Sequence, residues 1–176
     1  MNLRNGICSV LLTVCISAIA SAQTNTIDRL YLAFNVSAGG AISKTNDYAT
    51  RSCGLMVGVR FHQRLATFIT ETADLNLTKT TDARKYDETL TLGAGVSYTF
   101  PVGKVFSIEP VLSCSSTIIK TDLSYLTPKL EVRGCCQIPN KSAFYIGLGM
   151  QYLHPYSKQV ATNMLMAYLT LGFKLF

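Results

Sequence analysis

The feature that most restricts the fold of this chain is an apolar residue at every second position, repeated in eight separate stretches. In the last stretch this apolar series comprises Leu165, Ala167, Leu169, Leu171, Phe173 and Leu175. A period of two indicates a β-strand with one apolar face and one mixed face. This strand runs to the last residue, so it needs a pairing partner. In a closed barrel that partner is the first strand, and the sequence therefore predicts a barrel.

The predicted strands cover residues 30–41, 53–61, 65–77, 89–100, 106–117, 125–138, 143–153 and 164–176. At about 9 to 14 residues each, they are long enough to cross a bilayer at the tilt of a barrel. Polar loops over 43–51, 78–88, 120–122 and 154–163 alternate with tight turns over 62–64, 101–104 and 139–142. In the third stretch, Glu71 falls on the apolar face unless a bulge shifts the register.

A soluble barrel such as a lipocalin is the main alternative fold, with its apolar face turned inward. The second face of these strands decides against it, because that face holds Gly, Ser, Thr and a few charges of both signs. A solvated exterior needs more Lys and Glu, whereas small residues suit the narrow lumen of eight strands. The prediction is an all-β, eight-stranded antiparallel up-and-down transmembrane barrel, with long loops outside the cell and short turns in the periplasm.

Aromatic residues gather near both ends of the predicted strands, as interfacial anchoring requires. The turn side carries Phe61, Phe100, Phe106, Phe144, Phe173 and Phe176, and the loop side carries Tyr48, Tyr86, Tyr125, Tyr152 and Tyr156. We expect each group to form a girdle on the outside of the barrel.

The first 22 residues read as a signal peptide. Arg4 is followed by an apolar run over 7–19 and by small residues before Gln23, the pattern of a cleavable leader rather than of a membrane helix. Residues 23–176 then form the barrel domain. A leader implies export, and we expect the bacterial outer membrane as the destination.

The formal net charge is +6, and about +5 once Arg4 is removed with the leader. This excess is spread thinly over turns and loops, without the basic run that nucleic-acid binding requires. It suits contact with anionic lipid headgroups. Four cysteines follow the leader: Cys53, Cys114, Cys135 and Cys136. If the fifth and sixth strands pair, Cys114 faces Lys129 and lies about 20 Å from Cys135, beyond disulfide reach. We expect all four thiols to be unpaired.

Several charged residues fall on the inward face, and they are the candidate functional residues of the lumen: Arg60, Asp74, Glu109, Lys129, Glu131 and Arg133. They could gate or line an ion path. Alternatively, they form a salt-bridge network that fills a narrow barrel and pairs its buried charges. We favour the network, since eight-stranded barrels are generally filled.

His154 and Ser157 lie together at the start of the fourth loop, and a serine esterase needs such a pair together with an acid. No Asp or Glu follows Ser157 in the chain, so we interpret His154 as a loop histidine and expect no enzymatic activity. The sequence also lacks metal-ligand spacing, and no cofactor is expected.

The chain resembles the small outer-membrane β-barrel proteins of diderm bacteria, grouped as outer-membrane β-barrel domain or porin-family proteins, with barrels of the OmpX and OmpA kind. The resemblance rests on residues 54–61 (GLMVGVRF), 92–98 (LGAGVSY), 107–112 (SIEPVL), 125–128 (YLTP), 145–149 (YIGLG) and 169–173 (LTLGF), with Phe176 at the end. It implies insertion by the barrel-assembly machinery into outer-membrane lipid. Some members of this family belong to secretion apparatuses.

One departure from the family concerns the assembly signal. Its usual form places apolar residues at even steps back from a terminal Phe, and here Lys174, Gly172 and Thr170 occupy those steps. The candidate signal is therefore Phe173, Leu175 and Phe176.

Taken together, the residues predict a membrane-inserted barrel with a structural role in the envelope, or an interaction role through its loops. A narrow passive pore for small solutes is the second hypothesis, and a lipid A-modifying esterase is the third.

Overall fold

The computed structural model describes residues 30–42, 47–61, 64–79, 84–119, 124–138, 141–156 and 163–176; the predicted leader lies outside these ranges. The strands are β1 (Leu30–Ala41), β2 (Asp47–Arg60), β3 (Leu65–Lys79), β4 (Arg84–Tyr98), β5 (Phe100–Pro101), β6 (Phe106–Thr117), β7 (Tyr125–Ile138), β8 (Ser142–Pro155) and β9 (Met164–Leu175). Within the described ranges, no helix has the length and apolarity needed to cross a membrane.

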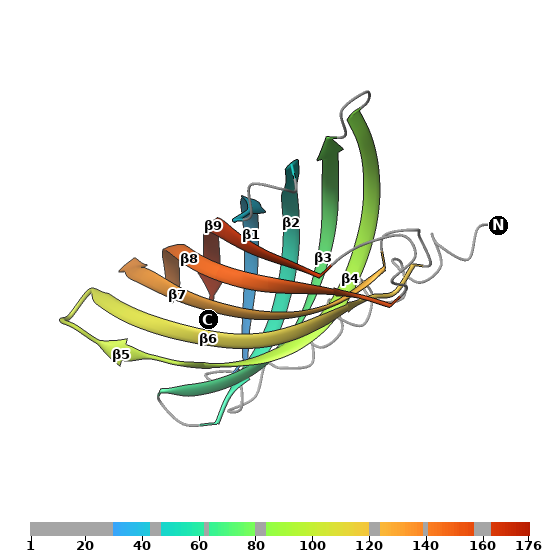
Figure 1. The fold of residues 1–176 in the computed structure, drawn as a ribbon. Coiled ribbons are helices and arrows are strands. Elements are labelled where there is room, and N and C mark those ends of the chain that lie inside the picture. The colour runs from blue at the N-terminus through green and yellow to red at the C-terminus, as the bar shows by residue number, and fades with distance from the viewer. Residues whose placement is uncertain are drawn as a thin grey trace.

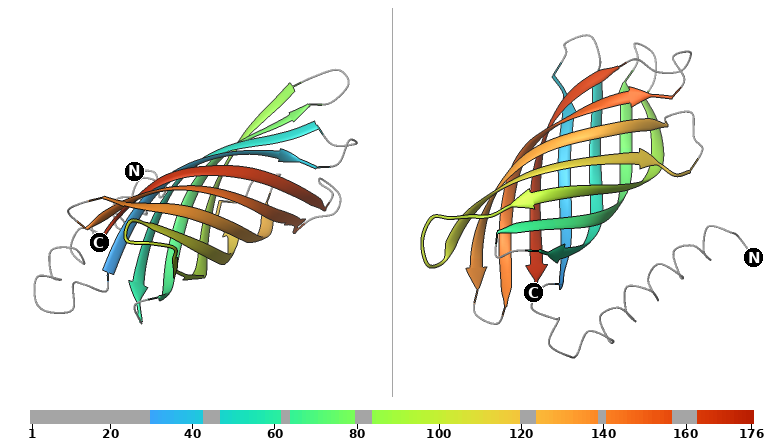
Figure 2. Two further views of the ribbon diagram at one scale, coloured as in Figure 1. Left: turned by 90° about the vertical axis from the view of Figure 1, so that its left-hand side faces the viewer. Right: turned by 90° about the horizontal axis from the view of Figure 1, so that it is seen from below.

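The strands form one antiparallel sheet that closes on itself (Figures 1 and 2). Strand β1 pairs with β9, so that Val36 lies opposite Leu171, and β4 pairs with β6, so that Val96 lies opposite Leu112. The two-residue β5 continues β4 beyond Thr99 and pairs with β6. The barrel therefore has eight strands around its circumference, as the sequence predicts, and the last strand pairs with the first.

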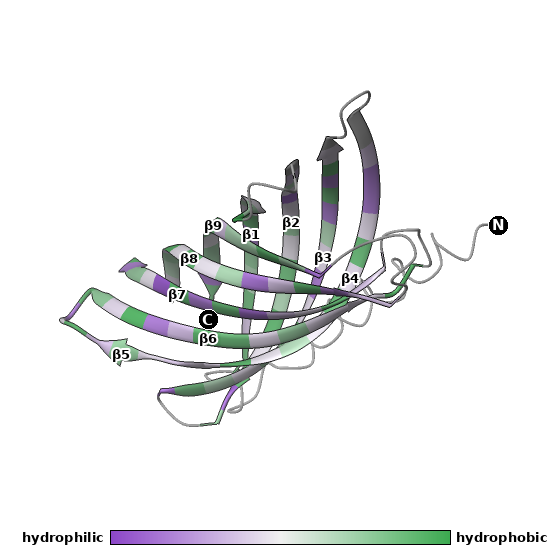
Figure 3. Cartoon of the chain, in the orientation of Figure 1, coloured by the Kyte–Doolittle hydropathy of each residue, from purple (hydrophilic) through white to green (hydrophobic). Residues whose placement is uncertain are grey.

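Alternation along each strand separates an outer apolar face from a packed interior, and Figure 3 shows the corresponding change of hydropathy from residue to residue. Large apolar side chains such as Leu148 (69% exposed) and Val36 (54%) point outward. The interior holds small polar side chains with a few aromatic and charged ones. This orientation is the reverse of a lipocalin, because the apolar face is on the outside.

Two of the predicted polar loops are mostly strand, which corrects the expected boundaries. Strand β2 begins at Asp47, inside the predicted loop 43–51; β3 runs to Lys79 and β4 begins at Arg84, inside the predicted loop 78–88. The polarity of these residues misled the prediction. Their backbone groups are satisfied by hairpin pairing, as between Tyr48 and Thr78, so the ladder continues beyond the apolar band.

Glu71 lies on the outer face, in a register without a bulge. It faces Leu55 of β2 and Leu92 of β4, and the pairing runs without interruption on both sides of it. The bulge that would have turned this side chain inward is absent from β3.

The predicted aromatic girdles are partly wrong. Phe61, Phe100, Phe106 and Phe144 on the turn side, and Tyr86, Tyr152 and Tyr156 on the loop side, are exposed as expected. In contrast, Tyr48 and Tyr125 are buried in the lumen, because they occupy inward positions of their strands. The ring of Phe176 also faces inward, 6.4 Å from the ring of Tyr31.

All four cysteines of the barrel are free, as predicted. Cys114 lies opposite Pro128, one residue from the expected partner, and Cys135 lies opposite Ser107.

Tyrosine rings in the lumen lie across glycines of the neighbouring strand. Tyr145 of β8 faces Gly172 of β9, and a Cβ on Gly172 would clash with the phenol ring of Tyr145. Tyr31 and Gly58 repeat this arrangement between β1 and β2. The missing side chain leaves room for the ring, so glycine at these positions is a packing requirement.

Gly172→Ala is therefore expected to destabilise the barrel by about 1–3 kcal/mol, because the added methyl group overpacks the lumen. Gly134→Ala is the matched control: it lies on the outer face, and the nearest atom to its Cβ would be 4.0 Å away. Urea unfolding in micelles, followed by far-UV circular dichroism, measures the unfolding free energy of both variants. Equal stability of the two variants would contradict this packing role.

Candidate functional site

Four charged side chains form a buried cluster in the turn-side half of the lumen: Glu109 of β6, Glu131 and Arg133 of β7, and Lys174 of β9. We call it the lumen cluster. Strand alternation points all four side chains inward, and each residue is 3–6% exposed. Buried charges of this kind are tolerated only when they are paired.

Glu109 is the centre of the lumen cluster. Lys174 Nζ donates to both of its carboxylate oxygens, at 2.6 Å and 2.5 Å. Arg133 Nη1 lies 3.8 Å from Glu109 Oε1, and the Cys135 thiol donates a weak bond to Oε2 at 3.8 Å. Two cations therefore surround this one carboxylate.

Arg133 extends the cluster across the lumen. Its Nε and Nη2 donate to the two oxygens of Glu131, at 2.9 Å and 3.0 Å, a bidentate geometry that restrains both side chains. Its Nη1 reaches Met56 Sδ of β2, at 3.9 Å, and its guanidinium carbon lies 4.7 Å from the centre of the Tyr145 ring. The lumen cluster thus connects β7 with the opposite wall.

Glu131 accepts a further hydrogen bond from β9, where the Tyr168 hydroxyl donates to its Oε2 at 3.4 Å. With two carboxylates and two cations, the formal charges of the lumen cluster cancel.

The other predicted lumen residues point inward but lie outside this cluster. The guanidinium of Arg60 stacks on the Phe176 ring, 3.8 Å from its centre. Asp74 and Lys129 line a separate cavity nearer the loop end. The sequence prediction missed Lys174 as a member of the cluster. The signal was present, since alternation places Lys174 on the same face as Tyr168 and Thr170.

The loop-side half of the lumen is lined mainly by hydroxyl and amide groups. Asn76 Nδ2 donates to Thr89 Oγ1 at 2.9 Å, and Tyr48 and Tyr125 pack among these groups. Two cavities of about 20 Å³ and 40 Å³ lie along the lumen, which is room for one or a few water molecules each.

The candidate assembly residues lie together at the turn end of β9. Phe173 packs against Phe144 of β8, with ring centres 4.9 Å apart, and Leu175 is exposed on the outer face. Phe176, in contrast, packs inward against Tyr31.

His154 points outward at the loop end of β8. Its ring stacks on Tyr152, with centres 6.4 Å apart, and its Nδ1 lies 3.1 Å from the amide oxygen of Asn163. Ser157 and His62 lie outside the described residues. Among the residues that the structure describes, no group of three His, Cys, Asp or Glu side chains could hold a metal ion.

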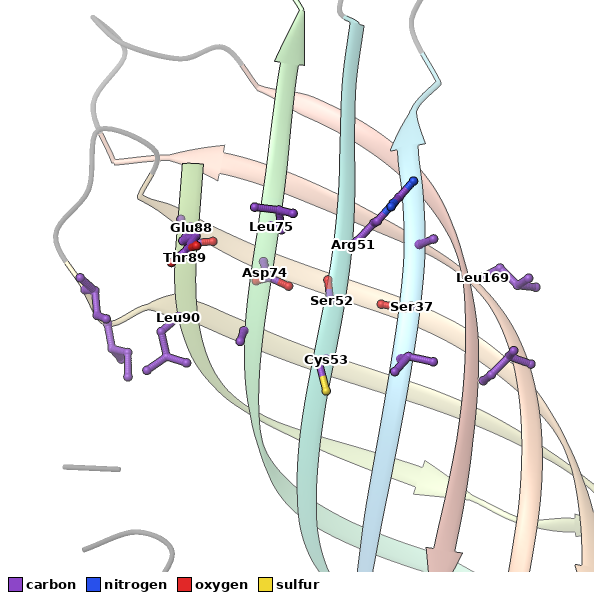
Figure 4. A pocket seen from close by; sticks show the side chains of 16 residues that line it. Ser37, Arg51, Ser52, Cys53, Asp74, Leu75, Glu88, Thr89, Leu90 and Leu169 are labelled. Carbon is purple, nitrogen blue, oxygen red and sulfur yellow. The ribbon is translucent and has the colours of Figure 1, made fainter. Parts of the chain in front are cut away.

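A groove on the outer surface crosses five strands (Figure 4). It follows two neighbouring rows of residues from Leu169 and Leu171 of β9 to Glu88 and Leu90 of β4. Small side chains line its middle, among them Cys53 and Ala73.

Comparison with known proteins identifies the fold. No family model matches the sequence, and no curated protein does. Among solved structures, the chain is similar to Neisserial surface protein A, with a TM-score of 0.59 at 13% identity over 83% of this chain and 96% of that one. The chain has the fold of a small outer-membrane β-barrel. Lower scores relate it to the outer-membrane enzyme PagL (0.46; 12% identity; 81% and 98% covered) and to Ail of Yersinia pestis (0.45; 11%; 82% and 99%).

The central position of Glu109 in this barrel leads to a stability prediction. Glu109→Ala leaves Lys174 buried without its carboxylate and is expected to cost about 3–5 kcal/mol of unfolding free energy. Combining Glu109→Gln with Lys174→Met removes both charges and should recover part of that loss. Urea titration of the purified protein measures each variant.

Glu88→Ala is the control for this series, because Glu88 is exposed on the outer face and should change stability by about 0.5 kcal/mol or less. If Glu109→Ala were as mild as this control, the lumen cluster would not contribute to stability.

Proposed function

We propose that this protein is an integral outer-membrane barrel that serves the bacterial envelope structurally or through its loops, without catalysis and without conducting solutes. Its partners would be outer-membrane lipids, the barrel-assembly machinery during insertion, and an extracellular or envelope ligand of the loops.

The outer surface supports the membrane location. Exposed Leu, Ile, Val and Phe side chains cover the outer face of the walls formed by β1, β6, β7, β8 and β9, and an apolar surface of this extent is unfavourable in water. Hydrocarbon is the matching environment, because the pairing of β1 with β9 and of β4 with β6 closes the sheet and satisfies its backbone groups there. The exposed Phe and Tyr side chains at the two ends fit the headgroup regions.

The lumen cluster is the observation that carries the proposal of a closed barrel. An ion that crossed the lumen would have to pass Glu109, Glu131, Arg133 and Lys174, whose charges are already paired. Separating Lys174 from Glu109 would leave two buried charges without partners, at a cost of several kcal/mol. This cost favours a structural plug over an ion path.

The absence of catalysis is part of the same proposal. His154 bonds an amide oxygen of Asn163, and a neutral amide orients an imidazole less strongly than the carboxylate of a serine hydrolase does. The loops remain the surface through which the barrel would meet a ligand.

Single-channel recording tests the closed lumen. Protein purified from the membrane of an expressing host is added to a planar bilayer, after a heat-dependent shift in gel mobility has shown that it is folded. We expect no discrete openings, because the paired charges of the lumen cluster block the turn-side half of the lumen. A large porin in the same lipid serves as the positive control.

Discrete openings of the wild-type protein that change with Glu109→Ala or Arg133→Ala would overturn this proposal. They would favour the narrow passive pore and make the lumen the functional site.

A further inference from the structure

Among the strand residues whose side chains the structure describes, outward-pointing charges lie on one side of the barrel. Of the strand residues whose side chains the structure describes, three charged ones point outward between the two rims: Arg51 of β2, Glu71 of β3 and Glu88 of β4. The described outward positions of β1, β6, β7, β8 and β9 carry no Asp, Glu, Lys or Arg. The face formed by β2, β3 and β4 therefore differs from the lipid-facing surface around the rest of the barrel.

Glu71 is the least expected of these three charges. It lies near the middle of β3, between Leu55 of β2 and Leu92 of β4, at the level of outward apolar residues on both neighbouring strands. Within the described part of the chain, its carboxylate makes no hydrogen bond or ion pair. An ionisable side chain at this depth is costly, so a partner with a cation or a donor is expected.

Arg51 is the cation on the same face, but it cannot reach Glu71 within one molecule. Arg51 lies opposite Leu75 of β3, and Glu71 is four residues before Leu75 on that strand. The Cα atoms of Arg51 and Glu71 are therefore about 14 Å apart. Figure 4 shows Arg51 beside Leu75 and Glu88, at the same level on three neighbouring strands.

The surface between Arg51 and Glu71 allows another chain to approach closely. Cys53 and Ala73 lie opposite each other there, in the outer groove, and both are small and exposed. Small side chains are typical of contacts between membrane-spanning elements, because van der Waals packing drives such contacts in lipid.

We propose that this face binds a second copy of the chain, with Arg51 of each copy paired to Glu71 of the other. Both signs of charge occur on one face, so a two-fold axis along the membrane normal forms the ion pair twice. Arg51 and Glu71 lie on neighbouring tilted strands, so part of the distance between them runs around the barrel and only part runs along the membrane normal. The long Arg side chain spans this difference in depth between Arg51 of one copy and Glu71 of the other. Glu88, near the loop end, stays with the lipid headgroups.

Sedimentation in density-matched micelles tests this proposal on protein purified from membranes. The wild type is expected to be a dimer. Glu71→Arg and Arg51→Glu should each weaken dimerisation by about thirtyfold or more, since each leaves like charges facing across the interface. The double variant Arg51→Glu with Glu71→Arg restores the pairs and should restore the dimer. Glu88→Gln is the matched control and should leave the dimer unchanged.

Glu71→Leu keeps the test decisive if a charge-reversed variant fails to fold. Leucine suits a lipid-facing position, so this variant should show the normal heat-dependent gel shift and should sediment as a monomer. A monomeric wild type, a double variant without recovery, or a Glu88→Gln variant that dissociates like Glu71→Leu would each overturn the proposal.

Discussion

The constraint on which the rest of this structure depends is closure of the backbone hydrogen-bond ladder. A strand inside a membrane has no water to satisfy its peptide groups, and here β1 meets β9 while β4 meets β6. Once the ring is closed, alternation assigns every side chain either to the outside or to a lumen only eight strands wide. The apolar exterior and the crowded interior are both consequences of this one requirement.

Crowding in the lumen explains two features of its composition. Glycines face tyrosines across neighbouring strands, as Gly172 faces Tyr145, because two large side chains do not fit at the same level. The four charges of the lumen cluster compensate one another, with Glu109 held by Lys174 and approached by Arg133. A barrel of this width is filled by its own side chains, and the proposed function assigns the role of the protein to its surfaces.

Two surfaces remain for that function, and they differ in chemistry. The loop end carries polar strand extensions beyond the apolar band, such as the start of β2 and the end of β3. The outer wall is apolar except on β2, β3 and β4, where Arg51, Glu71 and Glu88 point outward. Under the proposals made above, the first surface would serve recognition outside the membrane and the second recognition within it.

The sequence by itself determined the number of strands around the barrel and the alternation of inward and outward side chains along each strand. It also determined the inward position of Glu109, Glu131 and Arg133, because a period of two depends only on local backbone geometry. It did not determine where polar strands end, so the start of β2 at Asp47 was expected as loop. Tertiary structure alone decided which inward charges meet. Lys174 binds Glu109 from 65 residues away, and Tyr48 and Tyr125 enter the lumen rather than a girdle. The register of β3 likewise placed Glu71 outside. These outcomes depend on the pairing of distant strands, which alternation within one strand does not specify.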